Sequence, residues 1–201
     1  AYMVTFKTMD PLFVIDLSNP KAPKVLGELK IPGFSNYLHP YDETHIIGFG
    51  RDTDEVEPGF AQIKGLKVAM FDVSDVNNPK EMFKFNIGGS GTYSELLNDH
   101  KALMYSRSKN LMGFPVSIWG NGGDSYQGFY VYDIDLESGF NLKGRVSHFD
   151  LDQNASKIMY SYVDVISRGI YIDDTLFTVS PNKIAANDLE SLTFLDDLKL
   201  E

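Results

Sequence analysis

The sequence predicts an all-β protein that repeats one antiparallel unit about four times. The first observation is a strand, turn and strand at residues 13–33 that returns at 69–89. Six residues of the two copies are identical without a gap: Asp16/Asp72, Ser18/Ser74, Pro23/Pro79, Lys24/Lys80, Ile31/Ile87 and Gly33/Gly89. The second observation is apolar alternation along the strands, and the third is a set of short polar turns between apolar runs. A fixed period of this kind is typical of repeat proteins.

The second strand of the unit alternates cleanly. Val25, Leu29 and Ile31 fall on one face, and in the next copy Phe83, Phe85 and Ile87 occupy the same positions. Matching faces in matching register indicate that both copies cover the same kind of core.

Weaker third and fourth copies follow, because aspartates recur at intervals of 56, 61 and 55 residues. They are Asp16, Asp72, Asp133 and Asp188. Each interval is long enough for four ordinary strands. Apolar runs separated by polar turns supply the additional strands, at 36–41 and 45–49, at 93–97 and 101–105, and at 169–172 and 175–179. Two- or three-residue turns between such runs predict hairpins.

Each unit is therefore predicted to be a four-stranded antiparallel meander, which is the blade of a β-propeller. We expect one partial propeller domain over residues 1–201, with blades at about 1–33, 34–89, 90–149 and 150–201. A short helical turn is expected only within 148–168. The chain supplies about 15 strands where four blades need 16, so we expect a fragment of a longer protein. Its open edges favour pairing with another chain, and a homodimer is possible.

Composition limits the partners. The 28 acidic residues exceed the 18 basic ones, and a net charge of −10 opposes binding to nucleic acid or to an anionic membrane. No apolar run approaches the ~20 residues of a membrane-spanning helix. The chain has no cysteine, which excludes disulfides, thiolate zinc sites and cysteine nucleophiles.

Six motifs stand out along the chain: Asp10–Pro20, Pro23–Ser35, Tyr37–Asp42, Phe71–Asp75, Asp99–Ala102 and Phe114–Val116. They resemble motifs of secreted prokaryotic proteins that contain a C-terminal β-propeller domain. The strand and turn are also similar to the LVIVD repeats of extracellular propellers. The resemblance implies a secreted or cell-surface propeller of uncharacterised molecular function, in a family whose domain exceeds 201 residues. It assigns no catalytic residue.

The recurrent aspartates allow two interpretations. They form a ring of functional carboxylates, or each of them accepts hydrogen bonds from backbone N–H groups of its own turn. Repetition in every blade favours the structural reading. The long segments 34–36, 88–93 and 148–168, with 51–64 and 107–127, are expected on one loop face of the propeller. Long loops on a rigid scaffold are a usual place for binding.

Candidate ligand-binding residues lie on this loop face and along the channel: Tyr37, His39, Tyr93, Glu95, Trp119 and Tyr126. Trp119 is the only tryptophan and precedes a glycine run, so it could form an aromatic platform or cover a blade edge. The acidic run 51–57 is expected to be a solvated loop.

Asp150, Asp152 and Asn154 have the spacing of a calcium loop, but Ala155 and Ser161 exclude an EF-hand. An irregular, structural calcium site stays open there. The four histidines show no metal-binding spacing, and neither a G-x-S-x-G elbow nor a phosphate loop is present.

The leading hypothesis is a non-enzymatic scaffold or binding module at the cell envelope, which contacts protein, peptide or glycan through its loop face. The alternative is a hydrolase or lyase with acid and base groups in the channel. The channel candidates are Tyr37, His39, Tyr41, Tyr93, Glu95, Tyr171 and Asp173. An enzyme predicts that Glu95 and His39 converge, and a binding module predicts exposed aromatics on the loop face.

Overall fold

The structure is a computed structural model that describes residues 1–5, 11–57, 60–119, 125–149 and 162–200. Four antiparallel sheets account for nearly all of the regular structure, so the predicted all-β fold is confirmed. The chain divides into two compact units, Ala1–Ser90 and Gly91–Glu201, each of which is described by itself.

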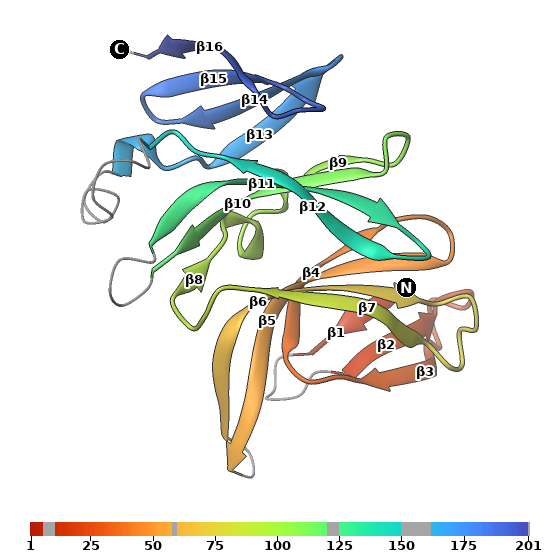
Figure 1. Cartoon of the computed structure of the whole chain (residues 1–201). Coiled ribbons are helices and arrows are strands. Elements are labelled where there is room, and N and C mark those ends of the chain that lie inside the picture. Colours follow the sequence, from red (N-terminus) through yellow and green to blue (C-terminus); the bar gives the residue numbers. More distant parts are fainter. Residues whose placement is uncertain (6–10, 58–59, 120–124, 150–161, 201) are drawn as a thin grey trace. The chain divides into compact units, whose positions relative to one another are not determined.

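The first unit contains two sheets (Figure 1). The first sheet has the order β1-β2-β3, with β1 (Tyr2–Val4), β2 (Pro11–Asp16) and β3 (Lys24–Lys30). The second sheet has the order β4-β5-β6-β7, with β4 (Phe34–Pro40), β5 (His45–Glu57), β6 (Phe60–Asp72) and β7 (Lys80–Ile87). Their shared core contains Leu12 and Ile31 packed with Ile46, Phe71 and Val73.

The acidic run 51–57, expected to be a loop, belongs to β5 instead. The β5–β6 ladder continues through the pairs Arg51↔Leu66 and Thr53↔Ile63 and forms a long hairpin (Figure 1). Two of its carboxylates have partners, because Lys64 forms an ion pair with Asp54 and Asn86 donates to Asp52 at 2.8 Å. Neutralisation of these charges allows the segment to continue the ladder rather than leave it.

The second unit holds the third and fourth sheets. The third sheet has the order β12-β11-β10-β8, and β9 also pairs with β10. Its strands are β8 (Thr92–Tyr93), β9 (Met104–Ser106), β10 (Leu111–Ile118), β11 (Tyr126–Asp135) and β12 (Gly139–Val146). The fourth sheet has the order β13-β14-β15-β16, with β13 (Arg168–Ile172), β14 (Thr175–Ser180), β15 (Lys183–Asp188) and β16 (Phe194–Lys199).

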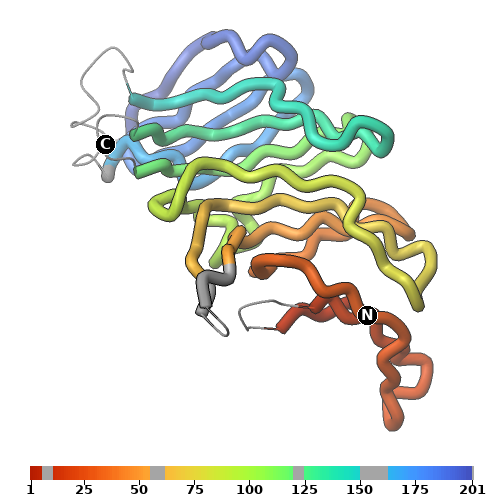
Figure 2. Tube along the Cα trace, turned by 60° about the horizontal axis from the view of Figure 1, so that its bottom comes forward, coloured from red at the N-terminus to blue at the C-terminus, as the bar shows by residue number. Residues whose placement is uncertain are grey.

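The third and fourth sheets are layered face to face, as the green-to-blue part of the trace shows (Figure 2). Phe129 and Val131 of β11 are fully buried in one core with Leu176 and Leu189 from the fourth sheet. This stacking of meanders is the packing that a propeller fold requires.

Two expectations for the third sheet are wrong. The runs 93–97 and 101–105 do not form a strand hairpin, because η1 (Glu95–Leu97) and η2 (His100–Ala102) replace most of it. Ser94 caps η1 and Asp99 caps η2, and each side chain accepts a backbone N–H two residues on. The segment 107–127 is not one long loop, since β10 runs through it.

The described residues therefore contain 16 strands rather than 15, because the innermost strand of the third sheet is split into β8 and β9. The described part of 148–168 contains one helical turn, η3 (Tyr162–Asp164). The expectation of a helical turn only in that segment is wrong, because η1 and η2 lie outside it. The described helices have three residues each, and none of them could cross a membrane.

Candidate functional site

A pocket of about 200 Å³ opens at one end of the third sheet, in the second unit. It combines three of the six predicted ligand-binding residues, Tyr93, Glu95 and Trp119. The rest of the lining comes from the residue after β8, from β10 and from the segment before β13: Ser94, Pro115, Ser117, Val165, Ile166 and Ser167. The site therefore lies on strand ends and on a connection between sheets.

Pro115 determines where β8 ends. Tyr93 pairs with Ser117, so the next position in register along β10 that would face Glu95 is Pro115. Proline has no N–H for this ladder. The Ser94 hydroxyl donates to the Pro115 carbonyl instead, at 2.6 Å, and accepts the Leu96 N–H. The chain consequently leaves the sheet after Tyr93 and places Glu95 at the pocket.

Gly91 brings Trp119 against the start of β8. The Trp119 N–H donates to the Gly91 carbonyl at 3.3 Å. A Cβ atom at position 91 would lie 2.5 Å from the Trp119 carbonyl oxygen. Only glycine permits this approach, which fixes the backbone of the single tryptophan.

The two aromatic residues of the pocket are accessible. Tyr93 and Trp119 each expose 37% of their surface. The Tyr93 hydroxyl donates to Glu95 Oε2 at 3.1 Å and accepts from Asn98 Nδ2 at 2.9 Å, so the phenol and the carboxylate are held together. Among the residues that the structure describes, Glu95 is the only charged one in the lining.

A buried glutamine holds the opposite wall. Gln127 is fully buried, donates to the Ile166 carbonyl at 3.0 Å and accepts the Ile166 N–H at 3.1 Å. This double hydrogen bond ties the connection before β13 to β11. The pocket wall is therefore attached to the sheet by side-chain contacts as well as by the chain.

Comparison with known proteins agrees with this arrangement of sheets. A family model described as a beta propeller domain matches residues 1–192. The chain belongs to this beta propeller family.

The matched relatives are archaeal and longer than this propeller chain. An uncharacterized protein of Archaeoglobus fulgidus is 32% identical over 200 residues, which is 100% of this chain and 26% of that protein. Another, of Methanocaldococcus jannaschii, is 31% identical over 201 residues, which is 100% of this chain and 27% of that protein. The propeller chain thus spans about a quarter of the length of these curated relatives.

A solved structure, a europium-containing methanol dehydrogenase, aligns at 10% identity with a TM-score of 0.44. The alignment covers 83% of this chain and 26% of that chain.

Tyr126, the fourth predicted residue in the propeller's second unit, lies outside the pocket. It is buried, and the Arg145 guanidinium lies 4.2 Å from the centre of its ring. Tyr130 packs edge-on against it. Burial raises the pKa of the Tyr126 phenol. These contacts give Tyr126 a place in the packing between β11 and β12.

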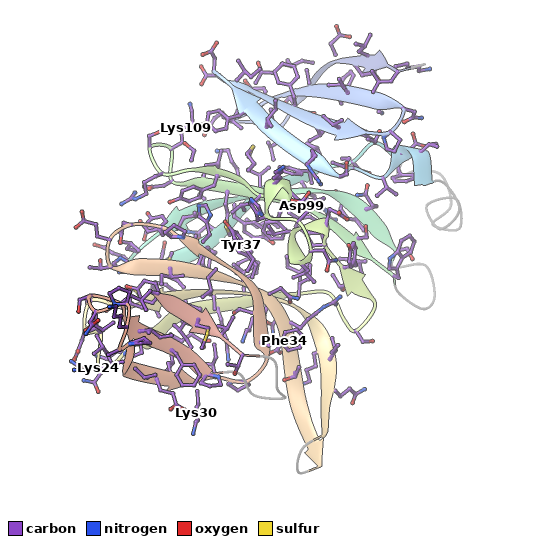
Figure 3. All side chains as sticks on the ribbon, turned by 180° about the vertical axis from the view of Figure 1, so that it is seen from behind. Lys24, Lys30, Phe34, Tyr37, Asp99 and Lys109 are labelled. Atoms are coloured by element: carbon purple, nitrogen blue, oxygen red, sulfur yellow. The ribbon has the colours of Figure 1, made fainter. Side chains whose placement is uncertain are left out.

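Tyr37 and His39 lie in the first unit of the propeller, on one face of β4 (Tyr37 is labelled in Figure 3). The Tyr37 hydroxyl and His39 Nδ1 are 2.8 Å apart, and the Tyr37 ring stacks on Phe49. Burial raises the pKa of Tyr37 and lowers the pKa of His39. Each unit thus contains some of the predicted residues, and Tyr93, Glu95 and Trp119 share a pocket.

The proposed calcium ligands, Asp150, Asp152 and Asn154, lie outside the described residues. Within the described part of the propeller, no group of three or more His, Asp or Glu side chains is arranged to hold a metal ion.

Three of the recurrent aspartates have the structural role. Asp16 and Asp72 each accept the N–H two residues on, at 2.8 Å, and Asp188 accepts the Ser191 N–H at 2.7 Å. In the third blade Asp135 takes this role, accepting the N–H groups of residues 137 and 138. These backbone bonds lower the pKa of Asp135. Asp133 differs, since its Oδ1 atom lies 4.0 Å from Nζ of Lys143.

A larger pocket of about 390 Å³ lies between the third and fourth sheets near Lys109 (labelled in Figure 3). Both lysines of its lining have carboxylate partners, Lys143 with Glu190 at 2.7 Å and Lys109 with Asp174 at 3.2 Å. We therefore regard the Tyr93–Trp119 pocket as the candidate site.

Proposed function

We propose that this propeller domain is a non-enzymatic binding module that holds a segment of a partner protein in the Tyr93–Trp119 pocket. The observation that supports the proposal is the pair of accessible aromatic rings beside one carboxylate on an anchored framework. Aromatic residues carry much of the binding energy in protein interfaces. A binding module with exposed aromatics was the expectation from the sequence.

The lining favours a neutral or cationic group. Pro115 and Ile166 supply apolar surface, and Glu95 is the one charged side chain among the described residues that line the pocket. An anion would meet the Glu95 carboxylate and the net charge of −10. A lysine or arginine side chain from a partner would instead contact the faces of Trp119 and Tyr93.

The pocket volume suits one side chain rather than a whole ligand. A side chain of eight or nine non-hydrogen atoms, at about 0.4 kcal/mol per atom, corresponds to a dissociation constant near the millimolar range. Higher affinity would come from additional contacts along a longer peptide or from several modules.

The test uses the fluorescence of Trp119, which is the only tryptophan of the chain. The probes are acetyl-Gly-Xaa-Gly-amide peptides in which Xaa is Arg, Phe or Glu, together with chitobiose as a glycan. We expect saturable changes with the Arg and Phe peptides and none with the Glu peptide. Tyr93→Ala should abolish them, whereas Tyr2→Ala, which removes an equally exposed tyrosine of the first unit, should not.

A response to chitobiose alone would retain a binding role but replace the peptide with a sugar. A lack of response to all four probes at concentrations of tens of millimolar would contradict a binding role for this pocket.

We also propose that the protein works outside the cytoplasm, at the cell surface or after secretion. The resemblance of the repeat to secreted and extracellular propellers supports this location. Protease treatment of intact cells, followed by immunoblotting of the native protein, tests it. Degradation without permeabilisation is the expected result, and protection until the cells are opened would refute the location.

A further inference from the structure

The fourth sheet has one face in contact with the third sheet and a second, outer face that is apolar and exposed. Ile170, Ile172 and Leu198 expose 53%, 57% and 61% of their surface. In register, Ile170 pairs with Phe177 on β14, and Val179, Ile184 and Leu198 form a row across β14, β15 and β16. The outer face is thus a continuous patch across four strands, rather than scattered residues.

The internal repeat indicates what kind of surface covers such a face. Ile184 and Ala186 lie 116 residues after Val68 and Met70 in the repeat, and Val68 and Met70 are 1% and 0% exposed. On β11 the corresponding face carries Phe129 and Val131, which are fully buried against the fourth sheet. Equivalent positions in the second and third sheets are therefore buried, which indicates a face shaped to receive another sheet.

The first sheet has a complementary outer face. Leu12 packs toward the second sheet, so residues of opposite parity point away from it. These include Met3 and Val25, which are 46% and 61% exposed, and the half-buried Phe13 and Ile15. The pairs Met3↔Phe13 and Ile15↔Val25 place them in adjacent rows. A β-bulge between the pairs Val14↔Gly27 and Ile15↔Val25 turns Val25 to this outer face, so the expectation that Val25 shares a face with Leu29 is wrong. In the repeat, Phe13 and Ile15 correspond to Ala69 and Phe71, which pack on the preceding sheet.

The outermost strands of the two faces also differ in charge. Residues 21–30, which include β3, carry three lysines and one glutamate, whereas residues 190–199, which include β16, carry three acidic residues and one lysine. Stacking of the first sheet on the outer face of the fourth sheet would bring β3 near β16. Opposite net charges favour that orientation.

We propose that the outer face of the fourth sheet binds the outer face of the first sheet of a second copy of this chain. The contact is head-to-tail, because each copy uses two different faces. Two such contacts close a dimer, and contacts that do not close produce larger assemblies. One face supplies roughly a dozen outward-pointing residues, so a closed dimer that uses both contacts would match the roughly 20–30 residues a side of a stable interface.

Light scattering of the intact chain over a hundredfold concentration range tests the proposal. We expect a concentration-dependent mass of two or more copies. Leu198→Lys should give a monomer, and Val25→Lys should do the same through the other face. Leu17→Lys is the matched control, because Leu17 is 53% exposed in a turn of the first unit and outside both faces.

A mixing experiment tests the head-to-tail orientation. Leu198→Lys retains the first-sheet face and Val25→Lys retains the fourth-sheet face, so an equimolar mixture should form a one-to-one heterodimer. A monomeric wild type at all concentrations would overturn the proposal. A Val25→Lys variant that dimerises like the wild type would also overturn it, since it would indicate pairing of identical faces. Circular dichroism melting confirms that each variant is folded.

Discussion

His148 should make the second unit sensitive to mild acid. The side chain follows β12 and is 8% exposed. Its ring nitrogens lie 2.9 Å from the hydroxyls of Ser180 and Thr178, which are themselves buried. Burial is the main cause that lowers the pKa of His148 to about 4; the nearby Lys183 ammonium acts in the same direction, and Asp164 and Asp197 act in the opposite one.

The sign of the effect follows from the two pKa values. The unfolded imidazole has a pKa of 6.5 and the folded one about 4, so the unfolded chain binds a proton that the folded chain excludes. The stabilising contribution is complete above pH 6.5 and declines as the pH falls toward 4. Because one pKa unit corresponds to about 1.4 kcal/mol, the contribution of His148 to the free energy of unfolding should fall by about 2 kcal/mol between pH 8 and pH 5.

Urea denaturation at several pH values, followed by circular dichroism, measures this loss. The range from pH 8 to pH 5 precedes most carboxylate titration, because those groups titrate near or below pH 4. His148→Gln should be less stable at pH 8 but should lose about 2 kcal/mol less than the wild type on acidification. His100→Gln, which replaces an exposed histidine, should retain the wild-type slope. Equal slopes for the wild type and His148→Gln would refute the argument.

Three further predictions concern the framework of the site. Gln127→Leu removes the hydrogen-bond partners of the buried Ile166 N–H and carbonyl, so the free energy of unfolding measured in urea should fall by about 2–4 kcal/mol. An unchanged urea midpoint would contradict a stabilising role of the double hydrogen bond between Gln127 and Ile166. Gly91→Ala should shift the Trp119 fluorescence maximum, whereas Gly89→Ala, whose new Cβ would meet nothing nearer than 3.7 Å, should not. Asp135→Ala should lower the melting temperature by about 2–4 °C, because it removes the hydrogen bonds from the N–H groups of residues 137 and 138. Asp133→Ala should lower the melting temperature less. The reverse order would indicate that Asp133 is the turn residue, as the repeat predicts.

The repeat made the architecture predictable because its signal depends on local rules. Alternation specifies which side of a strand is buried, and an aspartate before a turn specifies where the strand ends. These rules placed Asp16, Asp72 and Asp188 correctly. They failed at Asp133, because β11 continues to Asp135 and the turn begins two residues later. A shift of two residues retains the burial pattern, so alternation alone could not detect it.

The pocket was only partly predictable, for a related reason. Sequence alone identified Tyr93, Glu95 and Trp119 as candidates but could not show that they share a cavity. Gln127 and Ile166 were missed because a hydrogen bond between residues 39 positions apart leaves no local pattern. The local signal for the end of β8 is Pro115, because a proline inside an otherwise apolar strand predicts that the neighbouring strand stops there.

That proline also explains why the candidate site lies in the third sheet. A regular meander continues its innermost strand along the full length of its neighbour, as β13 does along β14 from Arg168 to Ile172. In the third sheet Pro115 removes the next donor, and Ser94 and Asp99 then cap two short helices. The chain leaves the sheet between Tyr93 and Glu95. Their side chains therefore lie at the pocket, whereas in a complete strand they would lie along the ladder with β10. The departure from the repeat therefore creates the pocket, while the repeat supplies the rigid sheets that hold its walls.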